Sequence, residues 1–162
     1  MDRFTVAFFG HKHIDVTSKI EKALDENVQR ILAQKEHVNF LFGRDSDFDL
    51  LAASSVRRVR KQYREDNSSL TLIIPEITPE YLEGVDTPEN YYSEIEVCLA
   101  AAVALPKYMM QVRNHEMIDR ADLVLCYVTH ESPVAWRCVQ YAHYQGKMVI
   151  NLADVEGSNS GK

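Results

Sequence analysis

The chain has 162 residues, the length of a single domain, of which 46% are hydrophobic and 26% are charged, as in an ordinary globular protein. Its formal net charge of −6 argues against a general nucleic-acid binder, whose binding surface would be basic. No stretch approaches the roughly 20 apolar residues of a membrane span, and the N-terminus lacks a signal-peptide core, so we expect a cytoplasmic protein without membrane contact. An odd number of cysteines, all in apolar contexts, agrees with free thiols in a reducing compartment: Cys98, Cys126 and Cys138.

The first half of the chain alternates predicted strands with predicted helices. The strands are short apolar or β-branched runs that end in Gly or Pro, and the helices have apolar residues at three- and four-residue steps. Strands are expected at Phe4–Gly10, His37–Gly43 and Leu70–Glu76, and helices around Ile20–Leu32 and Asp49–Tyr63.

The second half begins with a Pro- and acid-rich stretch at Ile77–Asn90, which indicates a surface loop. A helix is expected at Tyr91–Pro106, a strand at Ala121–Val128, a helix at Pro133–Gly146 and a last strand at Lys147–Leu152. The expected helix is apolar on all sides after Val97, so it must be buried by the rest of the chain or by a second copy. This pattern predicts a homodimer.

Strands that alternate with helices imply parallel βαβ units. The sequence therefore predicts the α/β class: a single Rossmann-like domain over residues 1–152, with a mostly parallel open sheet and helices on both faces. Residues 153–162 are polar and are expected to form a flexible tail.

In such a sheet, ligands bind beyond the carboxyl ends of the strands. The loops that should lie there are Gly10–His13, Gly43–Asp49 and Thr129–Trp136. A glycine at the end of a strand lets backbone N–H groups approach a ligand, and this could be the role of Gly10 and Gly43. No dinucleotide or nucleotide-triphosphate motif is present, and no spacing of His and Cys indicates a metal site.

Three segments together resemble the SLOG superfamily, in particular its YpsA-like branch of small Rossmann-like proteins. They are "FFGHKH", "FLFGRDSDFDLLAA" and "RNHEMIDRADLVLCYV". Members are similar in having TGHR after the first strand, TGxAxGxD after the second, and RNxxMVDxSD before a later strand. The resemblance covers roughly Phe4 to Leu152 and implies a nucleotide or an ADP-ribose-like ligand.

By this resemblance, Arg113 or Lys12 would meet the negative charge of the ligand, and Trp136 could stack on a base. Asp119 would hold Arg113 or neighbouring backbone donors. The expected ligand-binding residues are Gly10, His11, Lys12, Gly43, Asp49, Arg113, Asn114, Asp119, Glu131, Ser132 and Trp136.

The phosphate-binding loops depart from the family pattern. Asp45 and Asp47 stand where members have a small residue and a Gly, and two carboxylates should repel a phosphate. Pro133 falls in the loop where members have Gly-Gly-Thr, and it removes one N–H donor.

We expect a non-catalytic domain that binds or senses a nucleotide-derived molecule. The alternative is an enzyme that hydrolyses or transfers an N-glycosidic bond. The PGGxGTxxE signature of one related enzyme group is missing, and Arg137 stands where deoxyribosyltransferases have a Glu nucleophile. Glu131, Glu94 or Asp49 would have to supply the carboxylate. A DNA-processing role like that of the DprA branch is the third hypothesis, and the negative net charge opposes it.

Overall fold

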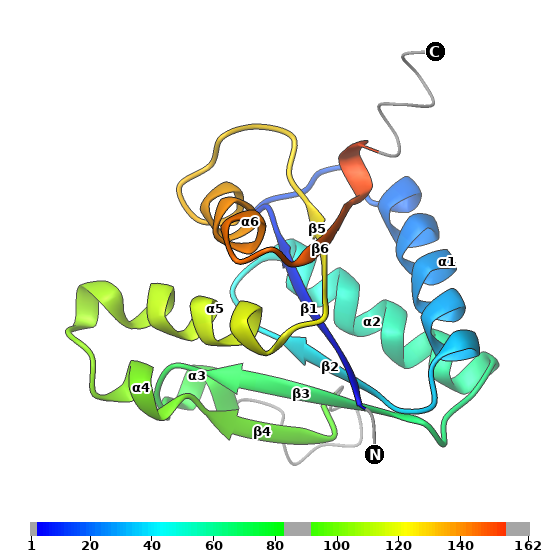
Figure 1. The fold of residues 1–162 in the computed structure, drawn as a ribbon, viewed down its shortest axis with the longest axis horizontal. Coiled ribbons are helices and arrows are strands. Elements are labelled where there is room, and N and C mark those ends of the chain that lie inside the picture. The colour runs from blue at the N-terminus through cyan, green and yellow to red at the C-terminus, as the bar shows by residue number, and fades with distance from the viewer. Residues whose placement is uncertain (1–2, 83–91, 155–162) are drawn as a thin grey trace.

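The computed structural model describes residues 3–82 and 92–154. Within them, one sheet of six parallel strands has the order β4-β3-β2-β1-β5-β6 (Figure 1). The strands are β1 (Phe4–Gly10), β2 (Val38–Phe42), β3 (Ser68–Ile74), β4 (Glu94–Val97), β5 (Leu123–Tyr127) and β6 (Met148–Asn151). The predicted α/β fold with a parallel sheet is confirmed.

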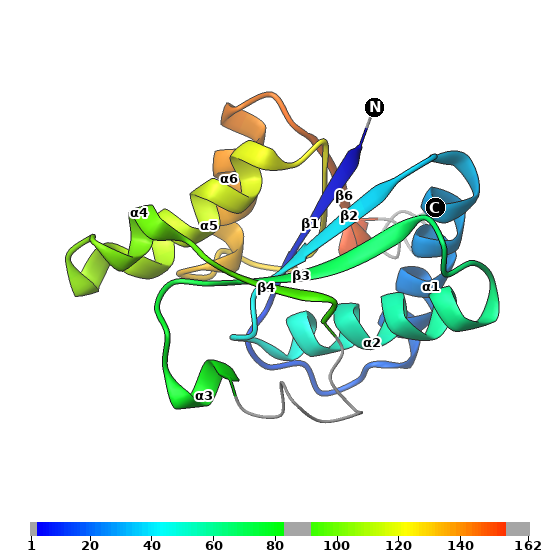
Figure 2. The same ribbon diagram turned by 90° about the horizontal axis from the view of Figure 1, so that it is seen from below.

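Helices cover both faces of the sheet (Figures 1 and 2). One face packs against α1 (Ser18–Gln34) and α2 (Asp47–Gln62), and the other against α4 (Leu99–Ala102), α5 (Met109–Arg120) and α6 (Ala135–Tyr144). A short α3 (Pro79–Leu82) and a 3-10 helix, η1 (Pro106–Tyr108), complete the described elements. None of these helices has the length and apolarity needed to cross a membrane.

The side chains of β1 divide between two cores, because successive residues of a strand point to opposite faces. Val6 and Phe8 belong to the core under α1 and α2, and Ala7 and Phe9 belong to the core under α5 and α6. The sheet is buried on both faces, as expected for a parallel sheet.

The order in which successive strands take their places in the sheet reverses at β1. β2, β3 and β4 follow on one side of it, whereas β5 and β6 lie on the other side. Gly10 at the end of β1 is in register with Tyr127 at the end of β5. The loops that leave these two strands therefore diverge, and a crevice is expected between them.

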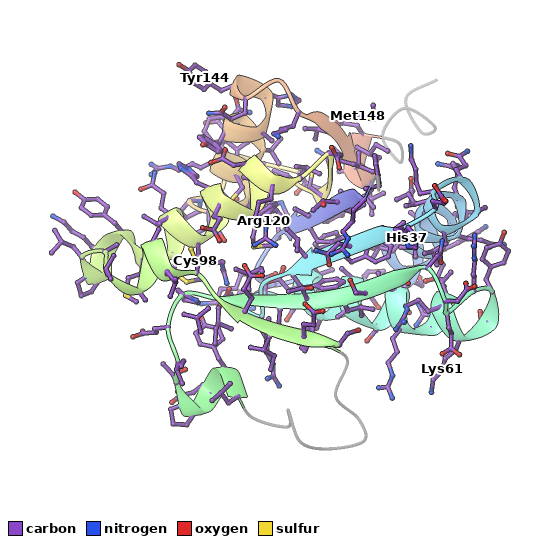
Figure 3. The ribbon with its side chains drawn as sticks, turned by 60° about the horizontal axis from the view of Figure 1, so that its bottom comes forward. His37, Lys61, Cys98, Arg120, Tyr144 and Met148 are labelled. Carbon is purple, nitrogen blue, oxygen red and sulfur yellow. The ribbon has the colours of Figure 1, made fainter. Side chains whose placement is uncertain are left out.

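The helix predicted at Tyr91–Pro106 is wrong. Residues 94–97 form β4, which pairs with β3 from Thr71↔Glu94 to Ile74↔Val97, and only Leu99–Ala102 is helical. The alternation of Glu and apolar residues at 94–97 has the period of a strand. The Glu96 side chain pairs with Arg120 of α5, and Figure 3 labels Arg120.

The segment after β4 is also not buried on all sides. Leu99 is 75% exposed, Val103 87% and Leu105 62%, whereas Cys98 and Ala101 are buried. The argument that led from an enclosed apolar helix to a homodimer therefore loses its premise, although an exposed apolar surface remains.

The other expectations for this half of the chain have mixed outcomes. Part of the predicted loop, Pro79–Leu82, is helical, and residues 83–91 lie outside the described residues, as do 155–162 of the predicted tail. Cys98, Cys126 and Cys138 are buried and free, as expected.

Candidate functional site

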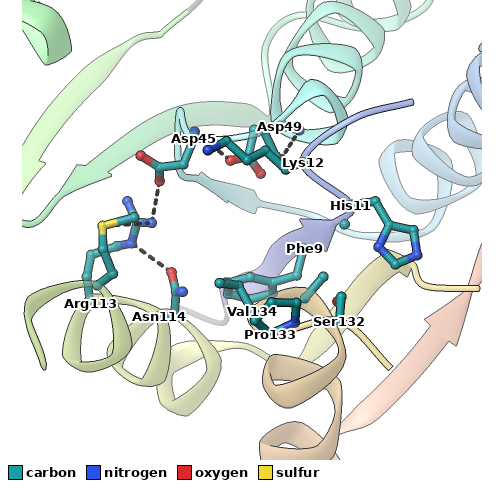
Figure 4. Close-up of a pocket in the computed structure, with 14 residues that line it drawn as sticks. Phe9, His11, Lys12, Asp45, Asp49, Arg113, Asn114, Ser132, Pro133 and Val134 are labelled. Carbon is teal, nitrogen blue, oxygen red and sulfur yellow. Dashed lines mark hydrogen bonds and ion pairs between the residues drawn. The ribbon is translucent and has the colours of Figure 1, made fainter. Parts of the chain in front are cut away.

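A cavity of about 280 Å³ opens at the carboxyl edge of the sheet, at the point where the strand order reverses. Its walls come from the end of β1 and the following loop, the loop from β2 into α2, the first turns of α5, and the loop from β5 into α6 (Figure 4). The lining residues are Phe9, Gly10, His11, Lys12, Asp45, Ser46, Asp49, Met110, Arg113, Asn114, Ser132, Pro133, Val134 and Ala135.

Arg113 lies in the second turn of α5 and is only 2% exposed. Its Nη1 donates to the carbonyl oxygen of Ile73 at 3.0 Å, and its Nε donates to Oδ1 of Asn114 at 2.8 Å. Its Nη2 donates to Oδ2 of Asp45. The guanidinium is thus held by the protein on three sides, and its charge is already paired.

Asp45, which was expected to repel a phosphate, is the ion-pair partner of Arg113. Its Oδ2 accepts from Arg113, and its Oδ1 accepts from the Tyr81 hydroxyl at 2.7 Å. Burial, followed by the bond to Asp45, raises the pKa of Tyr81, so Tyr81 stays a donor. The carboxylate therefore joins α3 and α5 to the loop after β2.

Asp47 does not line the cavity. Its Oδ2 accepts from the backbone N–H of Ile14 at 2.9 Å, and its own N–H donates to the carbonyl oxygen of Lys12 at 2.8 Å. It fixes the loop after β1 against the start of α2.

Asp49 is a buried carboxyl group in the cavity wall, 6% exposed, in the first turn of α2. Its Oδ2 accepts from the N–H of Asp45 at 2.9 Å, and its own N–H donates to Oγ of Ser46, the N-cap, at 3.0 Å. Burial raises the pKa of Asp49 to about 6, although the Asp45 amide and the positive charge of Arg113 oppose the rise. A carboxyl group with such a pKa can accept a proton or a hydrogen bond. Near neutral pH it can also donate one.

His11 connects the loop after β1 with the loop after β5. Its Nε2 accepts from the N–H of Thr129 at 2.8 Å, and its ring stacks on His130 with centroids 4.1 Å apart. Burial and the neighbouring His130 lower the pKa of His11, so the ring is held neutral. Lys12, next in the chain, is exposed at the mouth of the cavity.

The two glycines have packing roles that the sequence did not reveal. A Cβ on Gly10 would lie 2.3 Å from Cγ of Phe48, so the glycine makes room for a buried ring. A Cβ on Gly43 would lie 3.2 Å from both Nη atoms of Arg113, so this glycine makes room for the ion pair. Neither has a positive φ.

Of the residues expected in the site, seven line the cavity: Gly10, His11, Lys12, Asp49, Arg113, Asn114 and Ser132. Asn114 follows Arg113 in the wall, and Ser132 caps α6, because its Oγ accepts from the N–H of Trp136 at 3.0 Å. Gly43 lies behind the wall, against Arg113.

Three expected residues lie elsewhere. Asp119 is exposed three turns from the start of α5, where Oδ1 accepts from the Tyr141 hydroxyl, so it does not hold Arg113. Glu131 and Trp136 line a separate hollow with His130 and Asn151. The loop after β5 passes between the two spaces, and only Ser132 to Ala135 face the cavity.

The sequence missed Met110 and the apolar wall formed by Phe9, Pro133, Val134 and Ala135. Met110 lies three and four positions before Arg113 and Asn114, which is the spacing of one helix face. The segment that resembles the SLOG superfamily begins at Arg113, whereas the helix begins at Met109, so the motif leaves Met110 out.

The cavity thus combines apolar walls with one buried carboxyl group, a neutral imidazole, an amide and two hydroxyl groups. Such a set suits a small molecule with hydrogen-bonding groups. No cluster of three or more His, Cys, Asp or Glu that could hold a metal ion occurs among residues 3–82 and 92–154.

No protein-family profile and no curated protein sequence matches the chain. Solved structures do. The molybdenum cofactor carrier protein MCP from Chlamydomonas reinhardtii is similar with a TM-score of 0.58 at 11% identity, over 91% of this chain and 75% of that one. DNA processing protein A (DprA) from Streptococcus pneumoniae is similar with a TM-score of 0.52 at 11% identity, over 95% of this chain and 61% of that one. At such identities the comparisons establish the Rossmann-like fold alone.

Proposed function

We propose that this protein binds a nucleotide-derived small molecule in the cavity at the carboxyl edge of its sheet, without catalysing a reaction, as a member of the YpsA-like branch of the SLOG superfamily. The observation that supports this most is the placement of the cavity. It lies at the strand-order reversal and is lined from four separate segments, as ligand sites in open α/β sheets are.

Asp49 is the second support. Burying a carboxyl group whose cationic neighbour is paired with another residue costs stability, and such groups are concentrated in functional sites. The carboxyl group of Asp49 accepts from the Asp45 N–H, and the bond to Ser46 Oγ is made by the backbone N–H of Asp49, so acceptor capacity of the carboxyl group remains for a ligand.

The test is thermal stabilisation of the purified protein by a panel of nucleobases, nucleosides, nucleoside monophosphates and ADP-ribose. We expect at least one compound to raise the melting temperature. Val134→Phe, which fills the cavity from its wall, should abolish the shift. Val16→Phe is the matched control, because Val16 is 74% exposed and does not line the cavity. A shift that survives Val134→Phe would place the ligand elsewhere.

An N-glycosidase or transferase is the second candidate, and the placement of one carboxyl group favours it. Of Glu131, Glu94 and Asp49, only Asp49 lines the cavity, and its pKa of about 6 suits a general acid or base. Release of free base from a nucleoside on incubation with the protein, abolished by Asp49→Asn, would establish this activity in place of simple binding.

We also propose that nucleic acid is not the partner. The chain carries a net charge of −6, and two carboxyl groups, Asp45 and Asp49, line the cavity against the cations Lys12 and Arg113. The protein should show no retention on single-stranded DNA at low salt. Retention that falls steeply with added salt would contradict the proposal.

A further inference from the structure

We infer that the cavity takes a phosphate-free ligand, a nucleoside or nucleobase, and that Asp49 recognises an amino or ring N–H group of its base. This inference rests on the proposed function and names the class of ligand. It differs from the resemblance, which implies a ligand held through phosphate.

The buried positive charge of the cavity, that of Arg113, is already paired, and the other cation in the lining, Lys12, is exposed at the mouth. The guanidinium of Arg113 donates to Ile73, Asn114 and Asp45, and it is 2% exposed. A phosphate could bind it only by displacing the carboxylate of Asp45, which the Tyr81 hydroxyl also holds in place.

Three of the backbone donors at the start of α2 are used as well. The N–H of Asp45 donates to Asp49, that of Asp47 to Lys12, and that of Asp49 to Ser46. A helix N-terminus attracts anions through its free N–H groups, and here alternate groups are bonded within the protein. A phosphate in this corner would also approach two carboxyl groups.

The loop into α6 lacks one backbone donor on the opposite wall, and a second donor is already bonded. Pro133 has no N–H, and the N–H of Trp136 donates to Ser132 Oγ. In Figure 4, Pro133 and Val134 lie across the space from Asp45 and Asp49. This wall is apolar, with Phe9 beside it, and it suits the flat face of a heterocycle.

Asp49 supplies the complementary polar contact. Its carboxyl group accepts from the Asp45 amide through Oδ2, and a carboxylate has about four lone-pair sites, so acceptor capacity remains for a ligand. A base with an amino group or a ring N–H satisfies that capacity, whereas a phosphate does not.

The size of the cavity agrees with this class. Its 280 Å³ lies just below the roughly 300–1,000 Å³ that pockets for drug-sized ligands span. It suits one nucleoside better than a larger molecule such as ADP-ribose.

The experiment compares matched ligands by calorimetric titration at pH 7.5: adenosine, cytidine and guanosine, each against its 5′-monophosphate. We expect at least one nucleoside to bind and its monophosphate to bind tenfold or more weakly. Asp49→Asn should weaken the nucleoside about tenfold or more, as expected for a lost hydrogen bond to a charged group. Asp47→Asn is the matched control, since it removes the same charge from the same helix outside the cavity wall.

The outcomes separate the two proposals. Tighter binding of a monophosphate than of its nucleoside, abolished by Val134→Phe, would overturn the phosphate-free class and leave ligand binding in the cavity intact. Equal effects of Asp49→Asn and Asp47→Asn would overturn the role of Asp49. Absence of binding by every nucleoside, nucleotide and ADP-ribose would overturn both the inference and the proposed function.

Discussion

The guanidinium of Arg113 and the carboxylate of Asp45, 68 residues apart in the chain, form an ion pair in the cavity wall, with Nη2 2.5 Å from Oδ2. The Arg113 side chain is 3% exposed and that of Asp45 27%. The pair is therefore buried on the α5 side and reaches solvent on the loop side. It connects the two faces of the sheet around the end of β3, where Ile73 accepts a further bond from Arg113.

Arg113→Met should destabilise the fold, because it leaves the Asp45 carboxylate and the Ile73 carbonyl without their donor. Loss of one member of a buried pair costs about 3 kcal/mol or more. Arg120→Met on the same helix should cost less than about 1 kcal/mol, because the Arg120–Glu96 pair is exposed. Urea unfolding of both variants measures the difference, and equal losses would show that the Arg113–Asp45 pair is not structural.

Asp49→Asn should stabilise the protein at pH 7.5. The pKa of Asp49 is about 6 in the folded state against 3.8 ordinarily, so folding loses stability as the pH rises through this interval. The variant avoids that loss, which is about 3 kcal/mol for a pKa raised from 3.8 to about 6. The advantage should fade as the pH falls toward 4, where the native carboxyl group is protonated.

Urea midpoints of Asp49→Asn and wild type at pH 7.5 and 4.5 check this. The lowered pKa of His11 adds a pH dependence of its own, but it is common to both proteins and cancels in the difference. A variant less stable than wild type at pH 7.5 would contradict the assigned burial of the charge.

Gly10→Ala should destabilise the protein by about 2 kcal/mol or more, because the new methyl group would overlap the Phe48 ring in a closely packed core. Adding Phe48→Ala should not restore stability, since Cβ of residue 48 itself lies 2.5 Å from the methyl position. Gly146→Ala should cost about 1–2 kcal/mol for another reason, the φ of +71° at the end of α6. Denaturant unfolding of the three variants tests the packing role, and a silent Gly10→Ala would refute it.

The apolar surface at the end of α4 should support self-association. Leu99, Val103 and Leu105 are each more than half exposed within seven residues of chain. We expect sedimentation velocity to show a concentration-dependent dimer, weakened by Leu99→Glu with Val103→Glu and unaffected by Tyr144→Glu on α6, also an exposed apolar position. A monomer at every concentration would end the homodimer hypothesis.

The fold was predictable because each strand and helix has its own local signature. Alternation of period 2 and period 3.6 marks the elements, and the rule for parallel sheets brings the ends of β1, β2 and β5 to one edge. The same reasoning failed at residues 94–105, because the strand-like alternation covers only four residues beside a run of apolar residues and the helix that follows is one turn long.

The candidate site was only partly predictable, since its decisive contacts join distant residues. The sequence placed Arg113 and Asp49 at the carboxyl edge of the sheet, where the structure has them. No spacing reveals that Asp45 pairs with Arg113 across 68 residues. The packing roles of the glycines were not predictable for a related reason. Their small size serves Phe48 and the ion pair, and only the packed structure shows this. The ligand-binding role of the lining residues stays a prediction for the titrations.

The walls of the cavity belong to both helical layers, α2 from one face of the sheet and α5 and α6 from the other. A molecule bound there would contact both helical layers and so connect them across the end of the sheet. Opening either layer would then require release of the molecule, so its binding energy would be added to the cost of both motions. Occupancy should slow amide exchange in the first turn of α2 and around Arg113 to the same degree, as a single mechanical unit.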